Sequence, residues 1–145
     1  MDLSIRRATE ADGDALFLLV KDFAVTFIAE RSAFEASLRK ILADEDANLS
    51  VAVVDGRVVG YCLGFDHYAF YTNGRTSFVE EIMVREDLRR HGVGRQLITC
   101  FEQWSISRDS KLVGLVTRRA ASFYQAIGYE PVCDSAMYEF QSSEG

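Results

Sequence analysis

The chain has 145 residues, 48% of them hydrophobic, and a formal net charge of −6, so we expect one compact domain over residues 1–145 with its own core. The acidic balance argues against nucleic-acid binding, which needs a basic face. No apolar run approaches about 20 residues, which argues against a membrane span, and the N-terminus lacks a signal-like stretch, so we expect a cytoplasmic protein.

The first third of the chain predicts a strand followed by two helices. The strand covers Leu3–Ala8, where polar and apolar residues alternate. A helix is expected over Ala15–Ile28, after a segment Thr9–Asp12 that resembles a capping box. A second helix ends near Leu42 and follows a complete capping box, Ser32–Glu35.

A β-hairpin is the strongest local signal in the chain. Strands are expected over Asn48–Val54 and Arg57–Phe65, joined by Asp55-Gly56, which suits a type I′ turn. The aromatic segment Asp66–Arg75 ends in Asn-Gly and is expected to be a loop.

Strands and helices alternate in the rest of the chain, and Gly128 is a fitting stop for the last helix. We expect a strand over Thr76–Arg85, a helix over Gly92–Ile106, a strand over Lys111–Val116, a helix over Arg118–Ile127 and a strand over Ala136–Phe140. This order predicts a mixed α/β domain around a central, mainly antiparallel sheet.

The three cysteines, Cys62, Cys100 and Cys133, lie far apart in apolar patterns. They are expected to be reduced core thiols, as is usual in the cytosol. No group of His, Cys and Asp has the spacing of a metal site, so no metal is expected.

The segment Arg89–Arg95 forms a Gly-rich turn between a predicted strand and a predicted helix. Glycines let the backbone come close to a ligand, and the first N–H groups of a helix attract anions, so this order suits a phosphate. The dinucleotide fingerprint is incomplete because position 97 is Leu. The Walker pattern is also absent, because no Gly-Lys-Ser/Thr occurs.

The spacing Arg89-x-x-Gly92-x-Gly94 after the strand resembles the acetyl-CoA-binding motif of the GNAT superfamily of N-acetyltransferases. The stretch Val84–Gly94 is similar to the family's V-x-P-x-x-R-G-x-G-x-G pattern, with Glu86 in place of Pro. Downstream, Phe123–Tyr129 looks like its F-Y-x-x-x-G-F/Y signature. The resemblance covers roughly Val51 to Phe140 and implies an α/β fold with a mainly antiparallel sheet of six to seven strands and about four helices.

The resemblance also implies three catalytic residues. Acyl transfer to an amine needs a base for the amine and benefits from a proton donor for the leaving thiolate. Glu80, or its neighbour Glu81, matches the family's acidic strand residue, and Tyr124 matches its general acid. Strand alternation places the two carboxylates on opposite faces. A solvated or arginine-paired carboxylate and a core tyrosine remain the alternatives.

The remaining candidates are implied to bind the cofactor or the acceptor. Pantetheine would lie along the strand residues Ile82, Met83 and Val84. The phosphates would be held by the turn residues Arg89, Arg90, His91, Gly92, Val93, Gly94 and Arg95. At a second cofactor contact, Thr117 replaces the family's frequent Asn. The acceptor pocket would include Phe23, Phe27, His67, Tyr68 and Tyr71, unless the aromatic loop packs on the core by its own side chains.

The sequence thus predicts an acetyl-CoA-dependent N-acetyltransferase that acetylates a primary amine, most simply of a small molecule, by direct attack in a ternary complex. Two alternatives remain. One is acetylation of protein N-termini or lysines, and the other is an acyl-CoA-binding module without catalysis. The exposed aromatic loop and the apolar last strand favour a homodimer, with no nucleic-acid or membrane partner.

Overall fold

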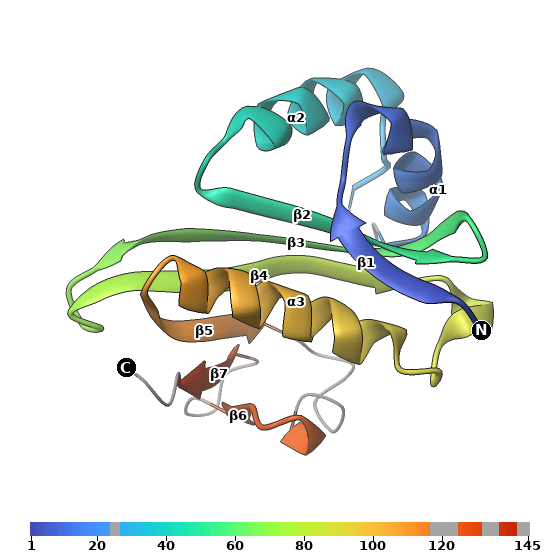
Figure 1. Ribbon diagram of the computed structural model, residues 1–145. Coiled ribbons are helices and arrows are strands. Elements are labelled where there is room, and N and C mark those ends of the chain that lie inside the picture. The colour runs from blue at the N-terminus through green and yellow to red at the C-terminus, as the bar shows by residue number, and fades with distance from the viewer. Residues whose placement is uncertain (24–26, 117–124, 132–136, 142–145) are drawn as a thin grey trace.

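The protein is built on one seven-stranded sheet (Figure 1). The computed structural model describes residues 1–23, 27–116, 125–131 and 137–141. The strand order is β1-β2-β3-β4-β5-β7-β6, and every neighbouring pair is antiparallel except β4 and β5. The strands are β1 (Leu3–Arg7), β2 (Ala47–Val54), β3 (Arg57–Ala69), β4 (Gly74–Val84), β5 (Ser110–Val116), β6 (Glu130–Pro131) and β7 (Met137–Gln141). The predicted mixed, mainly antiparallel α/β fold is confirmed.

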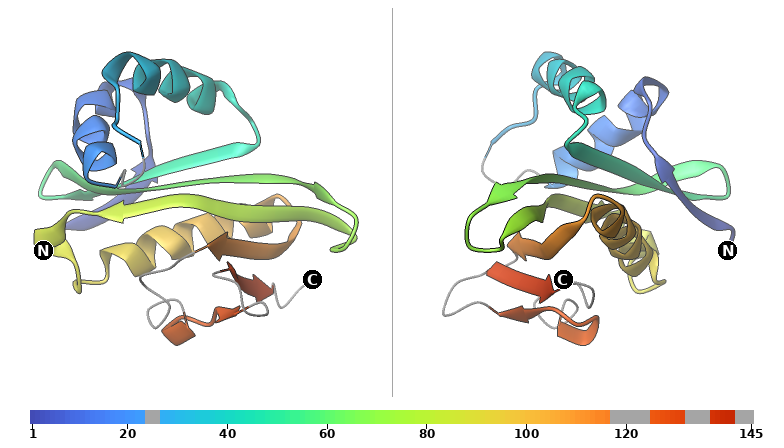
Figure 2. Two further views of the ribbon diagram at one scale, coloured as in Figure 1. Left: turned by 180° about the vertical axis from the view of Figure 1, so that it is seen from behind. Right: turned by 60° about the vertical axis from the view of Figure 1, so that its left-hand side comes forward.

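Helices cover both faces of the sheet (Figures 1 and 2). One face carries α1 (Gly13–Phe23), which follows the short 3-10 helix η1 (Glu10–Asp12), and α2 (Arg31–Ala43). The other face carries α3 (Val93–Ser107), which follows η2 (Glu86–Leu88). Two hydrophobic cores result, one between the sheet and each helical layer.

Local sequence signals explain most of the element ends. Asp55 and Gly56 have φ angles of 50° and 81°, as the predicted type I′ turn between β2 and β3 requires. The Thr9 N–H donates to Asp12 Oδ2 at 2.8 Å, and Arg6 donates two bonds of 2.8 Å to the same carboxylate. The entry to α1 is therefore fixed by Asp12, as the capping pattern predicts.

Several elements differ from the prediction. The first helix ends at Phe23 and not at Ile28, and the short strand β6 was not expected. The second helix begins at Arg31, with Glu30 as its N-cap and no side-chain capping bond, so the expected capping box at Ser32 does not form. The segment 66–75 is mostly strand, because β3 runs to Ala69 and β4 begins at Gly74. The expected fourth helix falls mainly outside the described residues, although Gln125 and Ala126 are helical.

A β-bulge interrupts the pairing of β3 with β4. Leu63 pairs with Glu81 and Gly64 with Val79, so Glu80 is the extra residue. A Cβ on Gly64 would lie 2.2 Å from the ring of Phe101 on α3. Only glycine at this position allows the helix to pack closely against the sheet beside the bulge.

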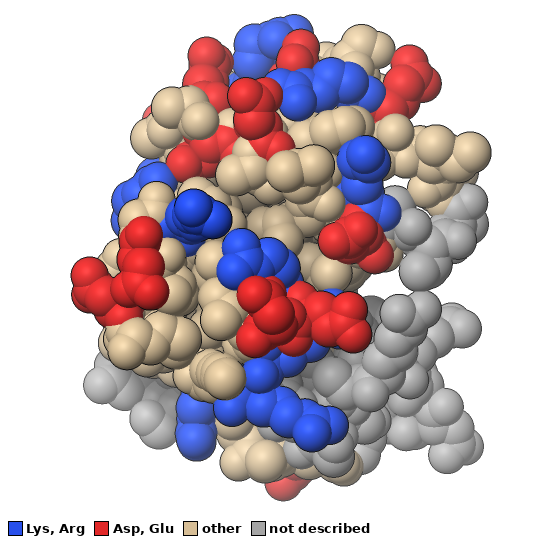
Figure 3. All heavy atoms as spheres, turned by 90° about the vertical axis from the view of Figure 1, so that its right-hand side faces the viewer, with Lys and Arg blue, Asp and Glu red and all other residues tan. Residues whose placement is uncertain are grey.

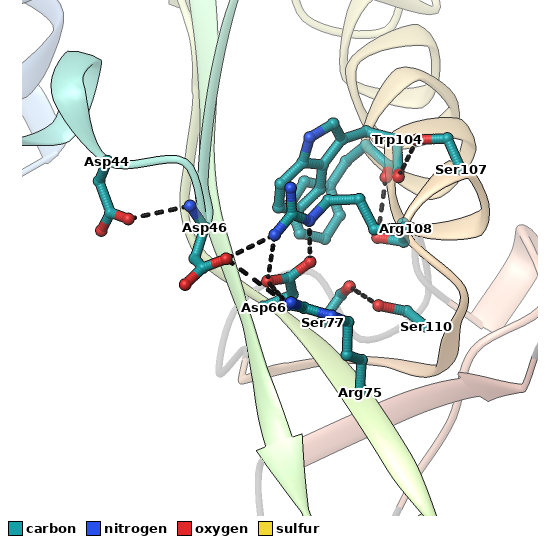
Figure 4. A network of polar contacts seen from close by, with 11 residues as sticks. Asp44, Asp46, Asp66, Arg75, Ser77, Trp104, Ser107, Arg108 and Ser110 are labelled. Atoms are coloured by element: carbon teal, nitrogen blue, oxygen red, sulfur yellow. Dashed lines mark hydrogen bonds and ion pairs between the residues drawn. The ribbon is translucent and has the colours of Figure 1, made fainter.

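A buried ion-pair network anchors the opposite end of the β3–β4 hairpin (Figure 4). Asp66 on β3 has a fully buried side chain and accepts hydrogen bonds from Arg75 on β4, at 2.7 Å, and from Arg108 after α3. Asp46, half-exposed before β2, pairs with the same two arginines. Tertiary pairing of Asp66 therefore extends the strands into the segment expected to be a loop.

Two of the three cysteines lie within the described residues, and both are free thiols. Cys62 is buried, and this burial raises the pKa of its thiol, so it behaves as an inert core residue. Cys133 lies outside the described residues. None of the described helices is long and apolar enough to cross a membrane.

Candidate active site

The sheet forks where β4 leaves β5. The two strands are paired from Arg75 with Ser110 to Val79 with Leu115. Beyond that point β5 continues to pair with β7, and β4 continues to pair with β3 alone. Over the described residues, the edge of β4 from Glu80 to Val84 therefore has no strand partner on its β5 side. Unpaired edge groups of this kind can bind an extended chain that carries amides.

The turn after β4 presents an open helix N-terminus. Arg90 and Gly92 have φ angles of 68° and 82°, in the left-handed region that favours glycine, and Gly92 is the N-cap of α3. The first helical bond runs from the Gln96 N–H to the Gly92 carbonyl at 3.1 Å. Among the described residues no side chain caps this end, so the N–H groups of Val93, Gly94 and Arg95 are available to an anion.

Positive side chains surround this turn. Figure 3 faces that end of the molecule and shows Lys and Arg side chains in a band beside Asp and Glu side chains. Arg90, His91 and Arg95 are exposed. The Arg89 side chain lies back along the end of β4, where Nε donates to the Val84 carbonyl at 3.0 Å. The predicted phosphate-binding residues of the turn are thus gathered at the end of β4, beside the fork.

The predicted pantetheine residues line the free part of β4. Ile82 and Val84 pack toward α3, whereas Met83 packs toward α1 and α2. All three are only partly buried, so this strand offers both backbone groups and apolar side chains to a ligand.

The two glutamates lie at and beside the bulge. Val79 and Ile82 both pack on the α3 side although they are three residues apart, because the bulge adds a residue between them. Glu81 lies on the α1 and α2 side, where Oε1 accepts a hydrogen bond of 2.8 Å from Tyr61. Glu80 is exposed at the bulge. The bulge breaks the regular alternation on which the expected placement rested, and the separation of the two carboxylates onto opposite faces stays a prediction.

The other predicted site residues lie in three places. Tyr124 and Thr117 lie outside the described residues. Phe23 ends α1, which packs on β3 and β4, and Phe27 follows it with 82% of its surface exposed. His67, Tyr68 and Tyr71 lie at the tip of the β3–β4 hairpin.

The hairpin tip is well separated from the fork within one chain. Tyr68 pairs with Arg75, and Glu81 lies six positions further along β4. At the usual rise of a strand this is about 20 Å. The fork and the turn are therefore adjacent, but the hairpin aromatics do not join them, and their role in the acceptor pocket stays a prediction.

Sequence reasoning overlooked Tyr61. It lies on β3, is 2% exposed and reaches Glu81 diagonally across the strand pair. In an apolar strand a tyrosine resembles any other core residue, and only its distance from a carboxylate on the next strand gives it a role. The described residues hold no cluster of three or more His, Cys, Asp or Glu side chains that could bind a metal.

A mixed sheet forked at its parallel pair, with an open helix N-terminus beside the fork, defines the acetyltransferase class of folds. The comparison with sequence families makes this specific. The model of the acetyltransferase (GNAT) domain matches residues 45–131, which is more than half of the chain. The chain belongs to the GNAT family, whose members use acetyl-CoA, as the motif predicted.

Solved structures share the fold at low sequence identity. A transcriptional regulator from Bacillus halodurans C-125 superposes with a TM-score of 0.84 at 21% identity, covering 92% of this chain and 97% of its own. Glucosamine-6-phosphate N-acetyltransferase from Arabidopsis thaliana superposes with a TM-score of 0.80 at 17% identity, and the match covers 91% of this chain and 94% of that enzyme. Ribosomal-protein-alanine N-acetyltransferase from Brucella melitensis biovar Abortus 2308 superposes with a TM-score of 0.74 at 22% identity, and the match covers 93% of this chain and 96% of that enzyme. No curated protein matches this chain significantly by sequence.

Proposed function

We propose that this protein transfers the acetyl group of acetyl-CoA to the primary amine of a small molecule. The observation that carries the proposal is the open N-terminus of α3 at the end of a strand whose edge is free. A pyrophosphate at the N–H groups of Val93, Gly94 and Arg95 would leave the pantetheine arm to run along Ile82 to Val84. The thioester would then lie near the bulge at Glu80.

The reaction is a direct attack in a ternary complex. The amine nitrogen attacks the thioester carbonyl carbon, a C–N bond forms, and the C–S bond breaks. The proton leaves the amine for the Glu80 carboxylate, and the coenzyme A thiolate takes a proton from Tyr124. A phenol with a pKa of about 10 is protonated at neutral pH and can donate without special tuning.

A panel of amines tests the proposal. Purified protein is mixed with acetyl-CoA and with single primary amines, amino sugars, polyamines and peptides with free N-termini or lysines, and released coenzyme A is followed by its thiol. We expect turnover with at least one small amine. Turnover with peptides alone would favour the alternative of protein acetylation. Acetyl-CoA binding without turnover on any amine would favour the alternative of a binding module.

Gly94→Glu should abolish acetyl-CoA binding while the protein stays folded. A glutamate in the first turn adds bulk and negative charge where the pyrophosphate would lie, yet carboxylates stabilise helix N-termini and Gly is a poor helix residue. We expect a loss of at least about 100-fold in affinity by calorimetry, since a charge-assisted contact is worth about 1.5–3 kcal/mol and several are lost.

The matched control for this variant is Gly74→Glu. It makes the same chemical change at the start of β4, where an added Cβ meets only Lys111 carbons at 3.6 Å. The control should bind acetyl-CoA like the parent. Tight binding by a folded Gly94→Glu variant would disprove the cofactor site.

Tyr124→Phe should bind acetyl-CoA almost normally and turn over about 10²-fold more slowly, which is the usual scale for losing a positioned acid. Calorimetry and steady-state kinetics separate the two effects. Because product release can limit turnover, single-turnover measurements isolate the chemical step. An unchanged rate in that step would show that Tyr124 is a packing residue only.

We also propose that the protein forms a homodimer through the β3–β4 hairpin tip. Tyr68 and Tyr71 are 73% and 71% exposed, and Phe70 between them is fully exposed, which makes an apolar cluster of the kind found at interfaces. Sedimentation at micromolar concentration should show a dimer, and Phe70→Glu should give a monomer. A monomeric parent across that range would refute the proposal.

A further inference from the structure

Tyr61 and Glu81 form a polar pair inside an otherwise apolar layer. The Tyr61 ring packs in the core beneath α1 and α2, with Leu63 and Met83 nearby. Its hydroxyl donates to Glu81 Oε1 at 2.8 Å. The register pairs Tyr61 with Met83 and Glu81 with Leu63, so the pair is diagonal across two strands. Both strands fix its geometry.

The direction of this hydrogen bond is set by chemistry. Burial and the neighbouring Glu81 charge raise the pKa of the Tyr61 phenol far above its ordinary value. The phenol therefore stays protonated and acts as a donor, while the carboxylate accepts. Tyr61 thus holds the Glu81 carboxylate in one orientation.

Glu81 differs in its partner from Asp12 and Asp66, the two buried carboxylates among the described residues. Asp12 pairs with Arg6, and Asp66 pairs with two arginines. Within the described residues, Glu81 has a neutral donor on Oε1, no cationic partner and no donor on Oε2. An oriented anion without a counterion, partly exposed and next to the fork, matches a ligand that brings the positive charge itself.

We propose that Tyr61 is a positioning residue that holds Glu81 as the anchor for the ammonium group of the acceptor. The inference rests on the proposed function and adds that the site selects amines that arrive protonated. The two carboxylates then divide the work. Glu81 binds and orients the ammonium. The adjacent Glu80 passes the first ammonium proton to solvent before attack and accepts the second as the C–N bond forms.

Binding without turnover tests this role. The protein is saturated with coenzyme A, so that no acetyl group is present, and titrated with benzylamine or with benzyl alcohol. These two ligands have the same shape and differ in charge. We expect the parent to bind benzylamine about tenfold or more tightly than benzyl alcohol, the usual scale for a hydrogen bond to a charged group.

Three variants separate position from charge. Tyr61→Phe keeps the ring and removes the donor. Glu81→Asp keeps the charge but moves it out of reach of Tyr61. Glu81→Gln keeps an acceptor for Tyr61 and removes the charge. The preference for benzylamine should fall about threefold in the first two variants, in which the charge is no longer held in place, and disappear in the third, in which the charge-assisted contact is lost. Benzyl alcohol should bind equally to all.

Glu10→Gln is the matched control, because it removes an exposed carboxylate on η1. It should keep the parent preference. The inference is overturned if the parent shows no preference, if Tyr61→Phe and Glu81→Asp both retain it, or if both ligands weaken equally in these variants. Thermal unfolding checks that each variant is folded. The amine panel decides the proposed function independently, because this assay involves no acetyl transfer.

Discussion

Replacing Asp66 with asparagine is expected to lower the free energy of unfolding by about 3 kcal/mol, because it leaves two guanidinium groups facing a neutral amide. The Asp66 side chain is fully buried, and it is the common partner of Arg75 and Arg108. The value lies at the lower end for broken buried pairs because both arginines are 24% exposed and can be partly solvated. The melting temperature should fall by about 10 °C for a chain of this size.

Asp46→Asn is the matched control for this effect. Asp46 pairs with the same two arginines but is 54% exposed, and exposed ion pairs contribute at most about 1 kcal/mol. Denaturant and thermal unfolding of the two variants give the comparison. Equal, small losses in both would show that the buried carboxylate adds nothing beyond a surface ion pair.

Glu80→Gln is expected to lower the rate of acetyl transfer by about 10²–10⁴-fold, the range for a positioned general base. The base works in its ionised form, so in the parent kcat/KM should rise with pH along the acid limb of its profile. The variant should lose this rise and keep the affinity for acetyl-CoA. Above the amine pKa of about 10.4, kcat/KM should fall in both proteins, because the ammonium form that Glu81 is proposed to bind is lost.

Glu81→Gln provides the contrast. It should raise KM for the amine and leave the acid limb of the profile in place. If Glu81→Gln removes that limb and Glu80→Gln does not, the two roles are exchanged. If neither variant changes the profile, water or a backbone group serves as the base.

The parts of the fold that follow local rules could be predicted from the sequence. A few neighbouring residues are enough to set three of these features: the Asp55-Gly56 turn, the Thr9–Asp12 capping segment and the strand–turn–helix around Gly92. The phosphate-binding turn belongs to this group, which is why it pointed to the family. Six of the seven described strands were predicted from similar local signals, and only the two-residue strand β6 was missed.

Features that depend on distant contacts were missed. The strands β3 and β4 extend further than expected because Asp66 pairs with Arg75 and Arg108. These ion pairs join residues of different elements, so local sequence does not show them. The bulge at Glu80 lies beside Gly64 on β3, which packs closely against Phe101 on α3. Both residues belong to other elements, so the sequence of β4 alone does not reveal the bulge. Alternation fails between Val79 and Ile82 at that bulge, so strand periodicity alone does not fix the face that Glu80 takes.

The extra residue in β4 is not required by the packing of this strand. Upstream of the bulge Val79 packs toward α3, and downstream Ile82 and Val84 do the same. Deleting the codon for Glu80 would remove the bulge and leave these three side chains on their present side, because a regular strand then alternates from Val79 through Glu81 to Ile82. Loss of this one residue would therefore remove the proposed base while the packing of the strand on both helical layers is kept.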